Sequence, residues 1–226
     1  MTFQINAQKW NGMELKIDQL LIGKDSFNMI NLSGDKIGSM VIEGYKTPKQ
    51  YIWKDISILD NAVYEETIYT FDQETYSLMN STIEFNQGNT AISGNLNWRA
   101  GSAKGIYHIL QGDKEKSINI DTTFSKLKDR AEVFAFINAI PLETGFQFPV
   151  NVLVQPNGEI WEMNVEIVAE EKCTVPAGEF DTYKINLTGG KLSNILYVSK
   201  GDKRKLVKVE VVGMPIVIEF VSSKAR

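Results

Sequence analysis

Residues 173–187, C-T-V-P-A-G-E-F-D-T-Y-K-I-N-L, hold a turn signal between two stretches in which apolar and polar residues alternate. Apolar residues occupy every second position over 161–167 before the turn and over 183–187 after it. A period of two residues places apolar side chains on one face of a β-strand and polar side chains on the other. Pro176 has no amide hydrogen for a sheet and Gly178 tolerates positive φ. These residues therefore predict a turn that joins two half-buried strands.

The same alternation continues through most of the chain. Turn signals recur about every 8 to 14 residues, the spacing expected of antiparallel strands with short connections. No repeat of fixed period occurs, which argues against a solenoid or a propeller. We predict a mainly β fold, a large curved antiparallel sheet that forms a half-barrel or barrel and is wired mostly as a meander. The expected strands, with 159–168 and 183–187 flanking the turn above, are 14–22, 27–32, 37–43, 51–59, 63–71, 78–85, 91–98, 105–110, 117–124, 145–154, 159–168, 183–187, 195–199, 206–212 and 216–221.

Residues 129–140 depart from this pattern. Asp129 is followed three residues later by Glu132, the capping-box signature with Asp in place of Ser or Thr. Pro141 ends the segment, and apolar residues at helical spacing lie between, namely Val133, Phe134, Ile137 and Ile140. We predict one amphipathic helix of about three turns, with its apolar stripe against the concave face of the sheet. On an open half-barrel this helix would act as a lid.

The composition indicates one ordinary soluble globular domain. The chain has 226 residues, of which 43% are hydrophobic, 10% aromatic and 23% charged. We expect a single β-rich domain over 1–226, with a looser N-terminal part over 1–48. A net charge of -4 and a pI near 5.2 argue against a nucleic-acid partner. The only basic cluster, K-G-D-K-R-K at 200–205, is expected to be a solvated hairpin tip.

Cofactors and membrane spans are not indicated. A single cysteine, Cys173, excludes an intramolecular disulfide and a Cys-rich metal site, and no Gly-rich phosphate loop opens a helix. We predict no metal, no cofactor and no apolar run of the roughly 20 residues that cross a bilayer. The N-terminus lacks the basic start and apolar centre of a signal peptide. The expected compartment is therefore the cytoplasm, or the periplasm or exterior if Met1 is an added start on a mature chain.

The segment V-P-A-G-E-F-D-T-Y-K over 175–184 resembles the hallmark of a family of mostly exported bacterial proteins known only as a domain of unknown function. The resemblance covers about the last two thirds of the chain, and the first third more loosely. Weaker matches are Asp35–Gly38, Thr70–Asp72, Leu142–Gly145, Ile195–Ser199 and Leu206–Val211. The resemblance to this family implies a curved antiparallel sheet similar to the half-barrel of lipoprotein carriers or to a barrel that holds a hydrophobic ligand. The family has no agreed activity, so no residue inherits a catalytic role.

Candidate catalytic residues are few. His108, the only histidine, shares a strand face with Ile106 and Leu110 and is a candidate general base, although a hydrogen-bonded or partly exposed histidine is the plainer interpretation. No nucleophile elbow or metal-ligand spacing accompanies it. The candidate carboxylates, each able to face inward from a strand, are Asp55, Glu65 and Asp121.

Aromatic residues on separate strands are the remaining signal. A curved sheet can gather them on its concave side, where they would contact a flat or apolar ligand, although core packing is the plainer interpretation. The candidate ligand-binding residues are Trp53, Tyr64, Trp98, Tyr107, Trp161 and Phe134. We expect a non-catalytic protein that holds an apolar or lipid-like molecule. The alternatives are a cofactor-free isomerase or cyclase in the same cavity and an interaction module that uses a sheet edge. No signal of oligomeric state is present.

Overall fold

The protein is described by a computed structural model that covers residues 8–60, 62–190 and 192–224. Within these residues, fifteen strands form one continuous sheet and two short strands form a separate hairpin. In chain order the elements are β1 (Lys9–Trp10), β2 (Met13–Glu14), the 3₁₀ helix η1 (Ile17–Gln19), β3 (Gly23–Ile30), β4 (Lys36–Lys46), β5 (Gln50–Leu59), β6 (Val63–Asp72), β7 (Leu78–Gln87), β8 (Thr90–Arg99), β9 (Ser102–Gln111), β10 (Lys114–Thr123), β11 (Leu127–Asp129), α1 (Arg130–Phe136), β12 (Gln147–Val154), β13 (Glu159–Val175), β14 (Gly178–Thr188), β15 (Ser193–Ser199), β16 (Leu206–Val212) and β17 (Val217–Lys224).

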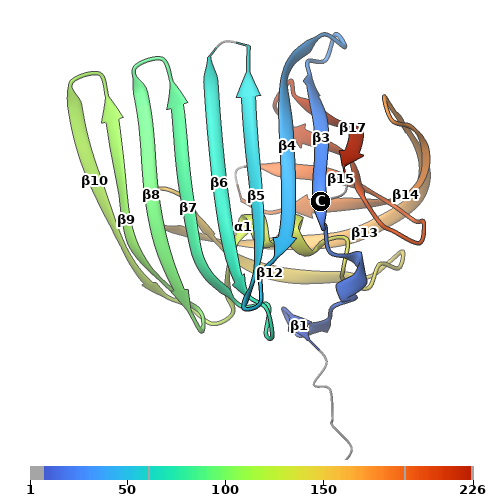
Figure 1. Cartoon of the computed structure of the whole chain (residues 1–226), viewed down its shortest axis with the longest axis horizontal. Helices are drawn as coiled ribbons and strands as arrows, with labels where there is room; N and C mark the ends of the chain where they lie inside the picture. The colour runs from blue at the N-terminus through green and yellow to red at the C-terminus, as the bar shows by residue number, and fades with distance from the viewer. Residues whose placement is uncertain (1–7, 61, 191, 225–226) are drawn as a thin grey trace, which may run out of the picture.

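Two meandering arms make the sheet. Strands β3 to β10 succeed one another toward one edge, strands β17 to β11 succeed one another toward the other, and β3 pairs with β17 where the arms meet. All neighbours are antiparallel except β11 and β12. The arms curve until they face each other with α1 between them (Figure 1). The edge strand β10 comes back to the β12–β13 loop, where a Cβ on Gly158 would lie 2.9 Å from Ile120. The predicted curved, barrel-like antiparallel sheet with one helix on its concave side is confirmed.

The turn predicted at residues 175–178 joins β13 to β14. Val175 stands opposite Gly178, whose φ of +127° is the positive value that the turn requires. The preceding strand is longer than the predicted 159–168. A register shift between Ile167 and Ala169 lets β13 keep pairing with β14 as far as Val175. Such a bulge bends a strand, and this one lies where the sheet curves.

The helix begins where the sequence predicts and ends earlier. Asp129 is the N-cap of a capping box: its carboxylate accepts from the amide of Ala131 at 3.0 Å, and Glu132 accepts from the amide of Asp129 at 2.9 Å. The predicted end at residue 140 is wrong, because α1 stops at Phe136. After it the chain tightens into turns, and Arg204 Nη1 donates to the carbonyl of Ile140 at 2.8 Å.

The predicted strand over residues 14–22 is also wrong. Only Glu14 of this segment lies in a strand, and η1 follows. The amide of Lys16 donates to the carbonyl of Ala139 at 2.8 Å, and the Gln19 amide group donates to the carbonyl of Asp202 at 2.9 Å. These contacts hold the segment against the turns after α1 and against the β15–β16 loop, so it is not available for sheet pairing.

The loop over 200–205 joins β15 to β16, as predicted for a hairpin tip, but it is not fully solvated. Lys203 Nζ donates to the carbonyl of Leu20 at 3.1 Å, and the amide of Arg204 donates to Gln19 Oε1 at 2.8 Å. Lys203, through its side chain, and Arg204, through its backbone amide, therefore satisfy oxygens of the segment around η1. The loop fastens η1 and the turns after α1 to the sheet.

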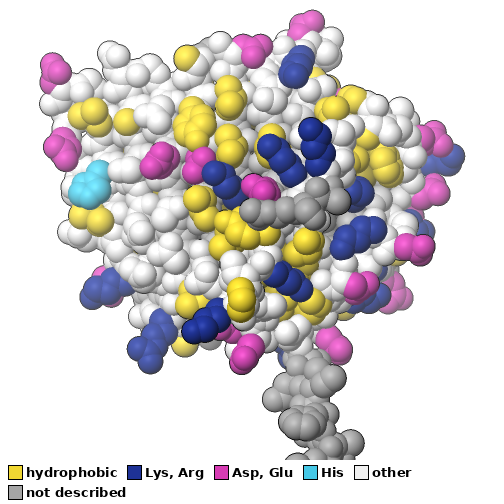
Figure 2. Space-filling view, viewed as in Figure 1, with side chains coloured by type: hydrophobic (Ala, Val, Ile, Leu, Met, Phe, Trp, Pro, Cys, Tyr) yellow, Lys and Arg dark blue, Asp and Glu magenta, His cyan; other side chains and the backbone are white. Residues whose placement is uncertain are grey.

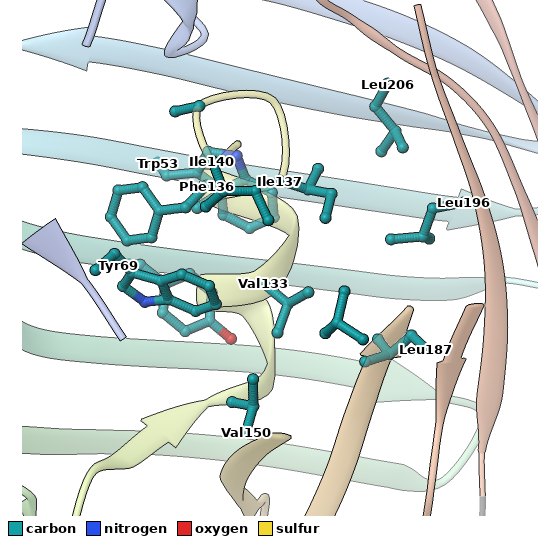
Figure 3. Packing of buried hydrophobic residues seen from close by; sticks show 14 of the residues in the cluster. Trp53, Tyr69, Val133, Phe136, Ile137, Ile140, Val150, Leu187, Leu196 and Leu206 are labelled. Carbon is teal, nitrogen blue, oxygen red and sulfur yellow. The ribbon is translucent and has the colours of Figure 1, made fainter. Parts of the chain in front are cut away.

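The interior on the C-terminal side of α1 is filled with aromatic side chains. Phe136 is fully buried, and its ring centroid lies 4.9 Å from that of Phe71 and 5.7 Å from that of Trp10. Tyr51 and Tyr76 complete the group at 6.4 and 6.1 Å. Figure 3 shows Phe136 with side chains of both arms around the helix. We call these five residues the Phe136 cluster.

Candidate ligand-binding site

A cavity of about 470 Å³ lies between the two arms, beside the N-terminal end of α1. Because alternate residues of a strand share a face, each arm contributes inward side chains at every second position. The wall is mainly apolar, and its apolar members are Met40, Trp53, Ile83, Phe85, Ile92, Ala131, Phe134, Leu153, Val154, Pro156, Trp161, Leu192, Val209, Val211 and Ile218. Residues that are far apart in the sequence thus enclose one hollow.

The start of α1 brings polar groups into this wall. Arg130 Nη2 donates to Asn194 Oδ1 on β15, and Gln155 Nε2 donates to Asp129 Oδ2. The guanidinium of Arg130 also lies 5.9 Å from the ring centroid of Phe134. These contacts tie the first residues of the helix to one arm and fix where their charges point.

Two carboxyl groups face them from the other arm. Asp55 on β5 stands opposite Thr67 on β6, and Glu65 on β6 stands opposite Ser57 on β5, so the two carboxyls occupy neighbouring positions on one face. Both border the cavity. The Oδ1 atom of Asp55 is buried and has no hydrogen-bond partner among the described residues.

Burial raises the pKa of these acids. For Asp55 the pKa rises to about 8, because the charged form is desolvated and Glu65 is close, while a hydrogen bond from Ser57 acts in the opposite direction. Burial also raises the pKa of Glu65, which the positive charge of Arg130 opposes. The Asp55 side chain is half-buried and borders the cavity. At neutral pH the Asp55 carboxyl is therefore mostly protonated.

Burial also shifts the pKa values of the residues at the start of α1. Burial raises the pKa of Asp129 to about 7, although its hydrogen bond from the amide of Ala131 favours the charged form. Burial lowers the pKa of Arg130, and the nearby carboxylate of Asp129 opposes this shift. The cavity thus contains a polar end, which we define as Asp55, Glu65, Asp129 and Arg130.

The structure places five of the ten predicted site residues on the cavity wall. They come from β5, β6, α1 and β13, and are Trp53, Asp55, Glu65, Phe134 and Trp161.

The other aromatic candidates lie elsewhere. Trp98 is buried and donates from Nε1 to Ser81 Oγ at 2.9 Å. Tyr107 is buried over Gly94, where an added Cβ would lie 2.1 Å from its ring. Tyr64 is on the outer face and donates to Glu66 at 2.8 Å.

The remaining polar candidates are on the outer surface. His108 is exposed, with Nδ1 3.0 Å from Ser117 Oγ, and Asp121 is exposed and accepts from Lys104 Nζ at 2.8 Å. Figure 2 shows the outer surface of strands β3 to β10, where hydrophobic side chains alternate with charges of both signs. Neither residue borders the cavity, so neither shares a site with Asp55 and Glu65.

Several lining residues escaped the sequence reasoning. Asp129 was recognised as a helix cap, but its place on the cavity wall was not predicted. Arg130, Gln155 and Asn194 were not predicted at all, because each is an ordinary polar residue beside a helix start or a turn. One signal could have identified Asp129 and Arg130. If the helix lies on the concave face of the sheet, the residues of its first turn must lie inside the sheet as well.

The described residues, 8–60, 62–190 and 192–224, contain neither a metal-binding cluster nor a helix that could span a membrane. No group of three or more His, Cys, Asp or Glu side chains is arranged there to hold a metal ion. Within the same residues, no helix has the length and the apolar character needed to cross a bilayer. Cys173 is buried and unpaired.

The fold and the cavity define a class of protein, a barrel-like antiparallel sheet around a hollow interior. Among solved structures, the chain is similar to a β-barrel-like protein of domain of unknown function DUF1849 from Brucella abortus, with a TM-score of 0.53, 7% identity and coverage of 91% of this chain and 98% of that one. A candidate exported protein with a YmcC-like fold from Bacteroides fragilis has a TM-score of 0.37 and 11% identity over 91% and 97% of the two chains. A candidate lipoprotein from Parabacteroides distasonis has a TM-score of 0.33 and 13% identity over 91% and 96%. Only the Brucella protein exceeds a TM-score of 0.5, and at this identity the similarity concerns the fold alone.

Sequence comparison identifies the family. A family model described as "Protein of unknown function (DUF3108)" matches residues 64–219, more than half of the chain. The chain belongs to this family, which confirms the family resemblance found at residues 175–184. No curated protein matches the sequence.

Proposed function

We propose that this protein is a non-catalytic binding protein that holds an apolar or lipid-like small molecule in the cavity between its arms. The cavity of about 470 Å³ with its mainly apolar wall carries the proposal. Pockets for small molecules usually have volumes of about 300 to 1,000 Å³ and are lined chiefly by apolar and aromatic side chains. An apolar hollow gains little from water, so an apolar ligand is the favoured occupant.

Packing elsewhere in the same interior supports this function. The Phe136 cluster fills the space beyond α1 with ring contacts of 4.9 to 6.4 Å. Protein interiors are normally close-packed, and unfilled volume costs stability. A hollow retained beside a well-packed core is therefore consistent with a ligand that fills it.

The direct test is to extract the purified protein with organic solvent and to identify what it releases by mass spectrometry. We expect a stoichiometric apolar or lipid-like compound from the native protein. The matched control is Ile83→Trp, which enlarges a side chain on the cavity wall and should reduce the retained compound without loss of fold. Equal amounts of the same compounds from both proteins, or none from either, would contradict the proposal.

Tryptophan fluorescence offers a second readout. Trp53 and Trp161 border the cavity, whereas Trp10 and Trp98 are buried outside its wall. An apolar probe added to delipidated protein should change the emission, and Trp53→Phe or Trp161→Phe should reduce that change. Trp98→Phe should leave it intact.

One observation favours a second candidate function, a cofactor-free isomerase or cyclase in the same cavity. Asp55, with a pKa raised to about 8, retains its proton at neutral pH beside Glu65. A protonated acid can donate a proton to one carbon of a substrate double bond while a second carboxylate removes a proton from the carbon attached to the other end of that bond, which moves the double bond by one position without a cofactor. The two carboxyls then exchange the proton to complete the cycle.

The binding and catalytic functions differ in one measurement. The extracted compound would be returned to delipidated protein in heavy water and examined for deuterium by mass spectrometry. Incorporation that disappears in Asp55→Asn favours the enzyme, and a bound but unlabelled compound favours the binding protein.

We also propose that this function operates in the periplasm or outside the cell. The support is the resemblance of residues 175–184 to a family of mostly exported proteins. Fractionation of the native cells tests this compartment, and recovery in the cytoplasmic fraction alone would contradict it.

A further inference from the structure

The polar end of the cavity has an excess of acidic groups. Three carboxyls, those of Asp55, Glu65 and Asp129, border the hollow together with one guanidinium, that of Arg130. The other polar side chains on the wall carry no charge, and they are Thr67, Tyr69, Gln155 and Asn194. Among the described residues that line the cavity, acidic groups therefore outnumber basic groups by three to one.

The single cation is already engaged. Arg130 donates to Asn194, lies 5.9 Å from the ring centroid of Phe134 and is close to the carboxyls of Asp129 and Glu65. Its Nε has no hydrogen-bond partner within the described part of the chain, but the acids Asp129 and Glu65 already compensate its charge. An anionic ligand would add a further negative charge to this group.

The acids on the opposite arm, Asp55 and Glu65, are not compensated by partners in the way that Arg130 is. Asp55 is half-buried at the cavity wall, and its Oδ1 atom is buried without a hydrogen-bond partner among the described residues. A buried carboxyl oxygen without a partner costs free energy, and a cationic donor, which also stabilises the ionised form of the acid, is the group that compensates it best. The cavity provides such a donor with a place beside Asp55 and Glu65.

We propose that the ligand is an amphiphile with an ammonium head group, which lies between Asp55 and Glu65 while its apolar tail follows the wall of Ile83, Ile92 and Val209. This inference rests on the proposed function and specifies the chemical class of its ligand. The apolar residues provide affinity for any tail of suitable size, and the two carboxyls select the head group.

Binding of an ammonium head group should change the protonation of the acids on the cavity wall. The groups that act on Asp55 are Glu65 and Ser57, and Asp55 in turn acts on Tyr69. Arg130 at the start of α1 acts on Glu65, and Asp129 borders the same cavity. An ammonium among them favours the charged carboxylates, so it lowers their raised pKa values and releases protons. A neutral head group would not lower these pKa values and would release no protons.

The test compares three ligands with one tail, dodecylamine, dodecanol and dodecanoate, added to delipidated protein below their micelle concentrations and followed by calorimetry at about pH 7. We expect dodecylamine to bind about tenfold or more tightly than dodecanol, the gain typical of a charged hydrogen bond, and dodecanoate to bind most weakly. Repeating the titration in buffers of different ionisation enthalpy should show proton release for the amine alone.

Variants locate the selectivity. Asp55→Asn and Glu65→Gln should each lower the ratio of amine affinity to dodecanol affinity, which is the quantity that reports head-group selection. Asp121→Asn, which alters an exposed carboxylate paired with Lys104, is the matched control and should leave this ratio unchanged.

The outcomes separate this inference from the function beneath it. Equal affinities for amine and alcohol, or tightest binding of dodecanoate with its loss in Arg130→Gln, would overturn the ammonium head group and leave the binding function intact. Binding of none of the three, with no compound in the solvent extract, would overturn both. The wild-type comparison alone decides these points if a variant fails to fold.

Discussion

The two ends of the interior differ although one sheet encloses both. Beyond the C-terminal end of α1, the Phe136 cluster fills the space with aromatic rings. Beside its N-terminal end, the arms leave a cavity of about 470 Å³ with buried acids on its wall. Curvature alone therefore does not produce the hollow, because the same curvature is compatible with a packed core.

The buried acids of the two ends also differ in their partners. Glu132, on the side of the packed core, accepts from Trp10 Nε1 at 2.9 Å and lies 3.3 Å from Lys128 Nζ. Asp55, on the cavity, keeps one oxygen that finds no hydrogen-bond partner among the residues that the structure describes. A carboxyl with several donors is typical of a structural role, whereas one that lacks a donor beside a hollow is typical of a binding site.

The largest expected effect is at the packed end. Phe136→Ala removes a fully buried ring, and such changes cost about 3 to 5 kcal/mol of unfolding free energy. Phe134→Ala, two positions away and facing the cavity, should cost about 1 kcal/mol because the hollow already exists there. Urea denaturation of both variants measures the difference. Equal losses would mean that the two ends are packed alike.

The next effect is the pH dependence that Asp55 produces. Its pKa is about 8 in the folded protein against 3.8 when unperturbed, so the folded state binds more protons between these values. The stability contributed by the protonated carboxyl is complete below the lower value and is lost as pH rises toward the upper one, by up to about 1.4 kcal/mol per pH unit.

Asp55→Asn should remove this decline. Its unfolding free energy relative to the native protein should rise between about pH 5 and pH 8, measured by urea denaturation at each pH. Asp121→Asn is the control with an exposed carboxylate. A constant difference across this range would show that Asp55 is not desolvated.

Replacing the acids Glu132 and Glu65 by amides should give a smaller difference in unfolding free energy between the two ends. Glu132→Gln would turn a donor toward Trp10 Nε1 and Lys128, so it should cost about 1 to 3 kcal/mol. Glu65→Gln should change stability by less than about 1 kcal/mol, because it removes a desolvated charge on the cavity wall. Thermal and urea unfolding measure the stability of both variants. A larger loss of stability in Glu65→Gln than in Glu132→Gln would mean that Glu65, and not Glu132, has the structural role.

The smallest effect is that of filling the cavity. Ile83→Phe adds volume where space exists, so stability should stay the same or rise by about 1 kcal/mol. Ile58→Phe, at an exposed position on the outer face, is the control. A loss of stability of 2 kcal/mol or more in Ile83→Phe would mean that the cavity wall is already close-packed.

Much of the fold was predictable because its signals are local. The alternation over 161–167 and the Pro-Ala-Gly turn located β13 and β14, although both strands extend to the turn, beyond the predicted 159–168 and 183–187, and Asp129 with Glu132 located the start of α1. The errors arose where distant contacts compete with local pattern. Residues 14–22 alternate like a strand, but contacts with Ala139 and Asp202 hold them elsewhere.

The candidate site was predictable only in part, for the same reason. An inward position follows from the strand period, which is how Trp53, Asp55 and Glu65 were selected. The same rule does not distinguish Trp98 and Tyr107, which are buried in packed regions, from Trp161, which borders the cavity. Whether an inward side chain meets another side chain or empty space depends on the opposite arm.

The sequence by itself determined the strands, their turns, the helix start and the family, because two-residue alternation, turn chemistry and capping act over a few neighbouring residues. Only the tertiary structure decided that Asp55 and Glu65 face Asp129 and Arg130 across a hollow. These pairs lie far apart in the chain, and they meet because pairing of β3 with β17 and the accumulated twist of the sheet bring the two arms together. No local pattern encodes that approach.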